Sequence, residues 1–164
     1  MLTINGWAIL AHPLFLDQWE KQIATVDALK AQKPDNYRKS ADAKLLAALV
    51  QLVGRNVPSD PMAAIYRQGV TLGEDRKHWF RAKFDNGRFR HFFRCSSAQK
   101  VIIFAWVNDE NSLRAYGSKT DSYKIFAFML DRGNPPDDWD ELYKAASDQS
   151  AIARLSKVTP KSPD

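Results

Sequence analysis

The spacing of hydrophobic positions divides the chain into a helical first third and a strand-rich middle. A short apolar run over residues 5–12 predicts a strand. Apolar side chains then recur every three or four residues over residues 15–29 and again over residues 45–53, which is the period of an amphipathic α-helix. Pro34 interrupts the repeat between them. Two helices joined so closely are expected to form an antiparallel helical hairpin.

In the middle of the chain the hydrophobic pattern changes to a period of two. Residues 78–84 and 88–95 alternate in polarity and flank Asn86-Gly87, the dipeptide that most strongly predicts a β-hairpin. Residues 100–107 are apolar on both faces, which is typical of a central strand covered by helix on at least one side. A further short strand is expected within residues 64–72.

The last third of the chain returns to helical spacing. Residues 121–130 predict a helix, and Gly133 is placed to end it. Residues 135–138 open a second, short helix. The length of 164 residues fits one domain. We therefore expect one α+β domain over residues 1–150 and a disordered polar tail over residues 151–164.

The alternation within the hairpin places its side chains on two different faces. In the register set by the turn, Lys83 lies opposite Arg90. Like charges directly across a hairpin destabilise it, so a polyanion bound to this face would explain the arrangement. The face that predicts core packing carries Phe80, Ala82, Phe84, Phe89, His91 and Phe93. The opposite face, which has no acid, carries Trp79, Arg81, Lys83, Arg90, Phe92 and Arg94.

Positive charge is concentrated around this hairpin. Residues 67–100 contain nine basic and three acidic residues, so they carry +6, more than the +5 of the whole chain. A localised basic field suits an anionic partner, with nucleic acid first among the candidates. Trp79 and Phe92 are expected to stack on bases while the cations hold phosphates. A solvated face, or one that binds a protein, is the alternative.

The remaining chemically reactive side chains indicate no cofactor. His91 shares the apolar face of the hairpin and is expected to be a core residue, His12 a turn or capping group, and His78 an exposed one. Cys95 is the only cysteine and is expected to be a small buried residue. No pair of ligands has the spacing of a metal site, and no phosphate-binding or dinucleotide motif is present.

No secretory signal and no apolar run long enough to span a membrane is found in the sequence. A cytoplasmic protein without membrane contact is therefore expected. Beyond the strand at residues 100–107, Asn108 or Asp109 could cap a helix. Arg114, Tyr116 and Lys119 follow and are expected to lie beside the basic face.

Four segments of the chain resemble a known protein family. They read NGWAILAHPLF, WFRAKFDNGRFRHFFR, VIIFAWVNDENSLRAYGSKTDSY and MLDRGNPPDDW. In the same order they resemble segments of the YhaV family of toxins, which act in type II toxin–antitoxin modules and belong to the RelE/ParE superfamily. The resemblance runs from about Asn5 to Trp139. It implies a RelE-like fold, in which an N-terminal helical hairpin and C-terminal helices pack on a twisted, mainly antiparallel sheet.

The resemblance also implies an activity and partners. It implies a metal-independent endoribonuclease that cleaves mRNA in association with the ribosome. It implies neutralisation by a PrlF-like antitoxin of the AbrB type, with operator DNA bound only through the toxin–antitoxin complex. Arg90 resembles the RelE arginine that contacts the scissile phosphate, and Tyr116 resembles the late catalytic tyrosine. Glu110 stands where RelE has another arginine, so Arg114 or Lys119 would substitute for it.

Metal-free cleavage of RNA begins with attack of a 2′-hydroxyl on the adjacent phosphate and leaves a cyclic phosphate or a 3′-phosphate. Arg90 and Arg114 are expected to stabilise the charge that develops on the phosphate. The base is expected to be Lys83, with its pKa lowered by neighbouring cations, or Tyr116. A ParE-like topoisomerase poison and a non-catalytic binding module are the alternatives. The expected RNA-binding residues are Trp79, Arg81, Arg88, Phe92, Arg94 and Lys119.

Overall fold

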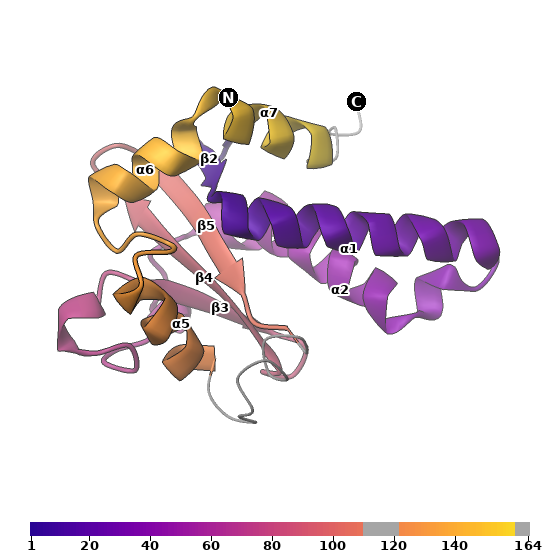
Figure 1. The fold of residues 1–164 in the computed structure, drawn as a ribbon, viewed down its shortest axis with the longest axis horizontal. Helices are drawn as coiled ribbons and strands as arrows, with labels where there is room; N and C mark the ends of the chain where they lie inside the picture. The colour runs from indigo at the N-terminus through magenta and orange to yellow at the C-terminus, as the bar shows by residue number, and fades with distance from the viewer. Residues whose placement is uncertain (110–121, 160–164) are drawn as a thin grey trace.

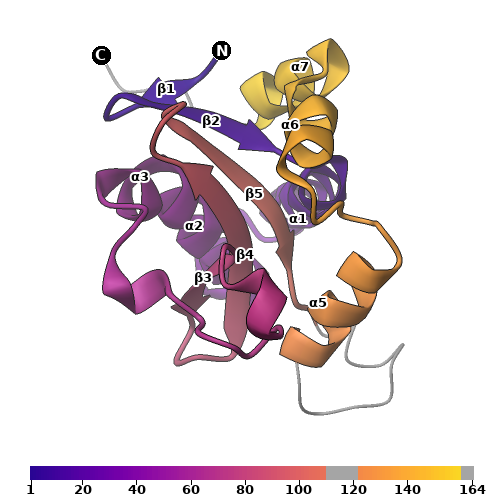
Figure 2. The same ribbon diagram turned by 90° about the vertical axis from the view of Figure 1, so that its left-hand side faces the viewer.

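The computed structural model describes residues 1–109 and 122–159 and places a five-stranded sheet between two layers of helices (Figures 1 and 2). The strands lie in the order β1-β2-β5-β4-β3, and β2 and β5 are parallel while the other neighbours are antiparallel. All seven residues of β5 are buried, which confirms the prediction of a central strand covered by helix. The strands are β1 (Thr3–Ile4), β2 (Trp7–Ala11), β3 (Phe80–Phe84), β4 (Phe89–Ser96) and β5 (Val101–Val107).

Both helices expected in the first third of the chain are present, and local capping explains where they begin. His12 caps the first, since its Nδ1 accepts a hydrogen bond from the Leu14 N–H (3.1 Å). Ser40 caps the second in the same way, with the Ala43 N–H as donor (3.1 Å). The capping role expected for His12 is confirmed. The helices are α1 (Pro13–Gln32), α2 (Ala41–Gln51), α3 (Val57–Ser59), α5 (Ser122–Asp131), α6 (Trp139–Ser147) and α7 (Gln149–Val158).

The two helical layers create a separate hydrophobic core on each face of the sheet. The first core joins the sheet to α1, α2, α3 and α7 around Phe15, Trp19 and Phe104. The second core joins it to α5 and α6 around Phe126 and Leu142. Within the two described ranges, no helix is both long and apolar enough to cross a membrane.

The hairpin of β3 and β4 has the register that its sequence predicts. Lys83 pairs with Arg90 and Arg81 with Phe92. The turn between the strands contains Asn86 and Gly87 at positive φ (56° and 79°), which is the backbone of a type I′ turn. Gly87 is suited to this conformation because it has no Cβ.

The end of α5 and the start of α6 also follow the sequence. Gly133, at φ 78°, donates its N–H to the Leu130 carbonyl (3.0 Å), and Asn134 donates to the Met129 carbonyl (3.1 Å). These two bonds form a Schellman motif. Asp138 caps α6 by accepting a hydrogen bond from the Glu141 N–H (3.0 Å).

Two predictions about irregular segments are wrong. The expected tail over residues 151–164 instead forms α7 as far as Val158, because Ala151 and Leu155 bury themselves in the first core. Arg154 adds ion pairs to Asp17 and Glu20 of α1. Residues 64–72 contain a short 3₁₀ turn, and only an isolated bridge from Arg67 to Phe80 reaches the sheet.

Candidate functional site

Strands β3 and β4 and the first turn of α5 bring two arginines onto one phenolic oxygen. The Nε of Arg81 donates to the Tyr123 hydroxyl oxygen at 2.9 Å, and the Nε of Arg90 donates to the same oxygen at 3.1 Å. The guanidinium of Arg90 also lies 5.2 Å from the centre of the Tyr123 ring. The sheet positions the two arginines because Arg81 and Arg90 lie on the same face of adjacent strands.

Hydrogen bonds to backbone carbonyls hold both guanidiniums in place. The Nη1 of Arg81 donates to the Ile65 carbonyl (2.9 Å), and the Nη1 of Arg90 donates to the Gly87 carbonyl (3.0 Å). Asn108, at the end of β5, accepts a hydrogen bond from the Arg90 backbone N–H (2.6 Å) and donates to the Arg88 carbonyl (3.2 Å). The site is therefore fixed by β5 as well as by the hairpin, so its donors are preorganised.

The two guanidiniums change the acid–base character of Tyr123. Burial alone would raise the pKa of this phenol, but the hydrogen bonds and positive charges of Arg81 and Arg90 outweigh burial and lower the pKa below its usual value. A neutral phenol oxygen accepts hydrogen bonds through two lone pairs. Because two Nε–H groups occupy them, the phenolic proton points away from both arginines.

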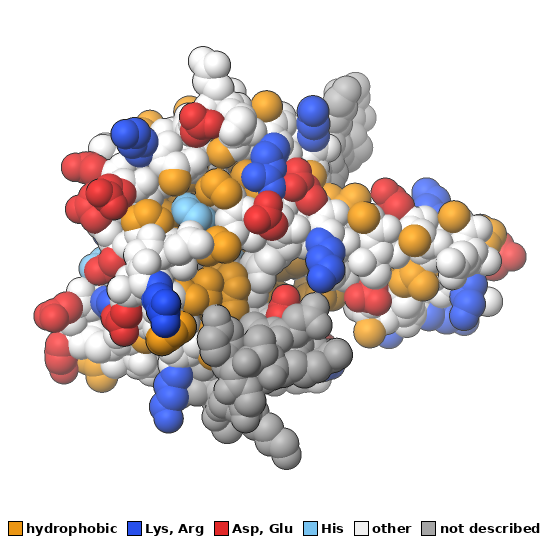
Figure 3. Space-filling view, in the orientation of Figure 1, with side chains coloured by type: hydrophobic (Ala, Val, Ile, Leu, Met, Phe, Trp, Pro, Cys, Tyr) orange, Lys and Arg blue, Asp and Glu red, His pale blue; other side chains and the backbone are white. Residues whose placement is uncertain are grey.

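Two further cations lie on the same hairpin. Lys83 is exposed and lies directly across the hairpin from Arg90. Arg88 is exposed in the turn, with its guanidinium 5.2 Å from the Phe89 ring centre. The strand segments 79–84 and 88–94 contain no acid. By contrast, acidic and basic side chains are mixed over α1, α6 and α7 in the view of Figure 3. The site is thus a locally positive surface suited to an anion.

Three expected RNA-binding residues are instead part of the packing of the molecule. Trp79 and Phe92 are 0% exposed. Phe92 stacks on Phe126 of α5 at 4.3 Å, and Trp79 meets the same ring edge-on at 4.9 Å. Helix α5 therefore covers them, and the base-stacking role expected for these two aromatics is wrong for this conformation. The guanidinium of Arg94 lies 5.7 and 5.2 Å from the ring centres of Trp79 and Trp139. It also donates to the Asp137 carbonyl (2.6 Å), so it holds the segment that leads into α6 against the sheet.

The structure thus brings together only part of the predicted site. Arg81, Lys83, Arg88 and Arg90 gather on the hairpin, whereas Arg114, Tyr116 and Lys119 lie outside the described residues. Tyr123 was not predicted as a site residue. Its position in the first turn of a predicted helix was visible in the sequence, but its contacts with arginines 42 and 33 residues away were not.

The histidines do not take part in this cluster. His91 is 0% exposed and packs against the rings of Phe15 and Phe104, and burial lowers its pKa to about 3. The prediction of a core histidine is confirmed, but the expectation that its polar atoms would be satisfied is wrong, since neither ring nitrogen has a hydrogen-bond partner among the described residues. Burial likewise lowers the pKa of His12 to about 4, although Asp17 opposes the shift. His78 was expected to be exposed; instead it is half-buried and its Nε2 lies 2.7 Å from an Asp137 carboxylate oxygen.

Cys95 was expected to be buried, but it is only partly buried at the edge of the first core. Desolvation raises the pKa of its thiol to about 11, so this side chain is a poor nucleophile near neutral pH. Across residues 1–109 and 122–159, no three side chains of the metal-ligating types His, Cys, Asp and Glu come together. The chemistry that these residues offer is binding of an anion by guanidinium and ammonium groups, with a phenol of lowered pKa beside it.

Comparisons with known proteins assign this chain to a family. Residues 9–147 match the family of YhaV toxins, described as "Toxin with endonuclease activity, of toxin-antitoxin system". Toxin YhaV of Escherichia coli O6:H1 is 46% identical over 140 residues, which cover 85% of this chain and 91% of the relative. Ribonuclease toxin YhaV of Escherichia coli K12 matches with the same identity and coverage. No solved structure matches the chain.

Proposed function

This chain belongs to the YhaV family of toxins, and on that premise we propose that it is an endoribonuclease that cleaves mRNA at the Arg81–Arg90–Tyr123 site. The convergence of two guanidiniums on one phenolic oxygen, at 2.9 and 3.1 Å, carries the proposal. It supplies a rigid cation pair for a phosphate and a titratable group at the same point. The name of the Escherichia coli K12 relative, a ribonuclease toxin, supports RNA as the substrate.

The phosphate is bound through the remaining donors of the arginines. A guanidinium has five N–H donors, and Arg81 and Arg90 each use only one Nε–H and one Nη1–H in the contacts described above. Their Nη2 groups remain to hold the scissile phosphate, and exposed Lys83, directly across the hairpin from Arg90, holds a neighbouring phosphate. These donors stabilise the extra negative charge of the pentavalent transition state.

The reaction needs no group beyond the RNA itself as nucleophile. The 2′-oxygen attacks the adjacent phosphorus and gives its proton to a base, while the bond to the 5′-oxygen breaks and that oxygen receives a proton. The products are a 2′,3′-cyclic phosphate, open to hydrolysis to a 3′-phosphate, and a 5′-hydroxyl. Tyr123, as phenolate, is a candidate for the base because its pKa is lowered. Lys83 and Tyr116 remain the other candidates, and Arg114 remains a candidate for charge stabilisation.

The partners follow from the family. Membership of a toxin–antitoxin family implies an antitoxin, and the sequence resemblance favours a PrlF-like antitoxin of the AbrB type, through which operator DNA is bound. The same resemblance favours a RelE-like fold and mRNA on the ribosome as the substrate. A ParE-like topoisomerase poison is less consistent with two guanidiniums that converge on a phenol of lowered pKa.

The proposal is tested by translating a defined, labelled mRNA in vitro with the purified protein. We expect new fragments that begin with a 5′-hydroxyl, and their loss when Arg90→Ala replaces the wild type. Arrest of translation with the message intact would overturn the proposal and favour a binding module or another target.

A further inference from the structure

A surface segment beside the proposed active site exposes large apolar side chains. Five such side chains are exposed among the described residues, and three of them lie within residues 62–70. The exposed fractions are 41% for Met62, 75% for Ile65 and 52% for Val70. Single exposed apolar residues are ordinary, but a concentration of them on one segment indicates an interaction surface.

This segment is held in place by its other side chains. The Tyr66 ring packs edge-on against Phe93 of the first core at 5.6 Å. Gln68 is 5% exposed, donates to the Arg76 carbonyl (2.8 Å) and accepts from the Leu72 N–H (3.2 Å). Because these anchors point inward, the exposure of Ile65 and Val70 is a fixed property of the fold.

The segment is also continuous with the site. The Ile65 carbonyl is the acceptor for the Nη1 of Arg81 at 2.9 Å, so the most exposed apolar side chain belongs to the residue that braces one of the two central arginines. Arg67, two positions further, is exposed and forms the bridge to β3, the strand at the edge of the sheet. A partner seated on residues 62–70 would therefore lie against Arg67 and Arg81 as well.

We propose that residues 62–70 are a docking surface for a segment of the antitoxin in which apolar side chains stand beside carboxylates. The apolar side chains would bury Ile65 and Val70, and the carboxylates would face Arg67 and Arg81. The inference rests on the proposed function, because antitoxin bound to residues 62–70 would cover the active site proposed above. Antitoxin bound here would displace the phosphate from Arg81 by occupying its neighbourhood.

The chemistry of residues 62–70 favours an antitoxin segment over RNA and over a second copy of this chain as the molecule bound there. Single-stranded RNA is held by aromatic faces and by cationic or hydrogen-bonding side chains, and Met62, Ile65 and Val70 offer neither. In a twofold-symmetric dimer formed through this surface, Arg67 and Arg81 of one copy would face the same basic residues of the other copy, and these like charges would repel. An acidic and apolar antitoxin segment satisfies both the apolar and the basic parts of the surface.

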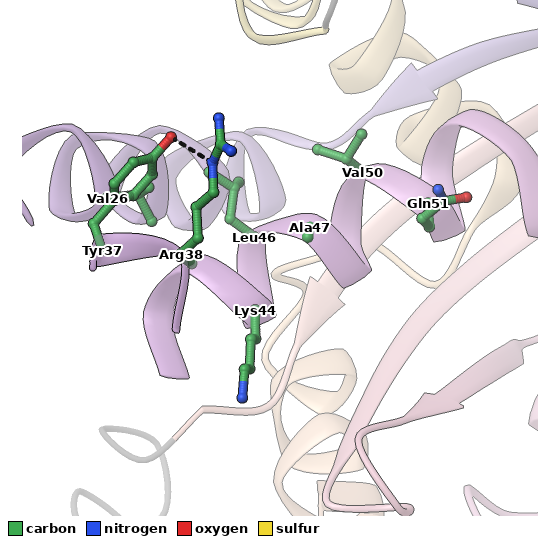
Figure 4. Close-up of a pocket in the computed structure, with 9 residues that line it drawn as sticks. Val26, Tyr37, Arg38, Lys44, Leu46, Ala47, Val50 and Gln51 are labelled. Carbon is green, nitrogen blue, oxygen red and sulfur yellow. Dashed lines mark hydrogen bonds between the residues drawn. The ribbon is translucent and has the colours of Figure 1, made fainter. Parts of the chain in front are cut away.

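The experiment compares a variant of this surface with a variant of a different apolar surface. The test variant is Met62→Ser with Val70→Ser, which leaves Ile65 and its contact with Arg81 unchanged, and Val70→Ser alone is the second variant in case the pair is unstable. The control, Ala47→Glu, changes a groove of about 560 Å³ between α1 and α2. Figure 4 shows that groove, where Val26 and Leu46 lie near the Tyr37–Arg38 hydrogen bond and Val50 lies further along α2.

Affinity for the purified cognate antitoxin and cleavage of mRNA during in vitro translation are measured on each protein. We expect the double variant to cleave mRNA as the wild type does but to bind antitoxin about tenfold more weakly or worse, as removal of buried apolar contacts usually does. In cells the antitoxin should then fail to relieve its growth arrest. Ala47→Glu should bind antitoxin as the wild type does.

Wild-type antitoxin affinity in the double variant would overturn the proposal. Loss of cleavage with antitoxin affinity intact would also overturn it, since the surface would then contact RNA or the ribosome. Weakened binding in Ala47→Glu alone would assign docking to the groove of Figure 4 instead. The affinity measurement does not depend on cleavage, so it remains decisive even if the wild type cuts no RNA.

Discussion

Replacing Tyr123 by phenylalanine removes one oxygen and nothing else from the site, so it isolates the role of the phenol. That oxygen accepts two hydrogen bonds from charged donors, at 2.9 and 3.1 Å. Hydrogen bonds to charged groups contribute about 1.5–3 kcal/mol each. Arg81 and Arg90 are only half-buried and keep their backbone acceptors, so water replaces much of the lost interaction.

We therefore expect Tyr123→Phe to lower the free energy of unfolding by about 1–2 kcal/mol. A domain with a typical stability of about 5–15 kcal/mol stays folded after such a loss. If Tyr123 transfers a proton in the reaction, the rate of cleavage falls by about a hundredfold to ten-thousandfold. Unfolding cannot account for a loss of that size, so stability and rate separate the structural role from the chemical one.

The pH dependence sharpens this test. A base acts when it is deprotonated, so the wild-type rate should rise with pH up to the pKa of Tyr123, which the two arginines place below the usual value for a phenol. This rise should be absent in Tyr123→Phe. Tyr37→Phe is the matched control, because Tyr37 is also hydrogen-bonded by an arginine, Arg38, which lowers its pKa, but it lies on another part of the molecule. A Tyr123→Phe protein that cuts RNA at the wild-type rate with the same pH profile would refute the reasoning.

Three further predictions concern Arg90 of the proposed site and two residues packed in the first core, His91 and Leu155. Arg90→Ala should reduce cleavage about a hundredfold or more while circular dichroism shows an unchanged fold. His91→Leu should keep its activity. In the wild type, only the unfolded state protonates His91 between pH 6.5 and about 3, so the free energy of unfolding falls with pH in this range, by up to about 1.4 kcal/mol per pH unit. Urea unfolding at pH 7 and at pH 5 should therefore show a smaller loss of stability in His91→Leu than in the wild type. Leu155→Ala should cost about 2–5 kcal/mol in urea unfolding, whereas a disordered tail would give no change.

The sequence was most informative where local chemistry determines structure. The Asn86-Gly87 turn sets the hairpin register, so the pairing of Lys83 with Arg90 could be predicted from alternation and turn type alone. Caps and breaks at His12, Pro34 and Gly133 likewise place helix ends through contacts within a few residues.

The sequence was least informative where the outcome depends on what packs on a face. Trp79 and Phe92 alternate with arginines, a pattern that fits a solvent-facing surface equally well, and only the approach of Phe126 on α5 buries them. Helix α7 was missed because two apolar side chains, Ala151 and Leu155, are a weak helical signal without the α1 surface that they meet. Tyr123 was missed as a site residue for the same reason, since its partners come from other elements.

The central claim is that this chain cuts mRNA through the cation pair that converges on Tyr123. The most direct measurement is sequencing of transcript 5′ ends after brief expression without antitoxin, with 5′-hydroxyl ends captured separately from phosphorylated ends. We predict new 5′-hydroxyl ends inside coding regions within minutes of expression of the wild type, and none with Arg90→Ala produced at the same level. Growth arrest by the wild type with no new transcript ends, or equal numbers of new ends from both proteins, would contradict the claim.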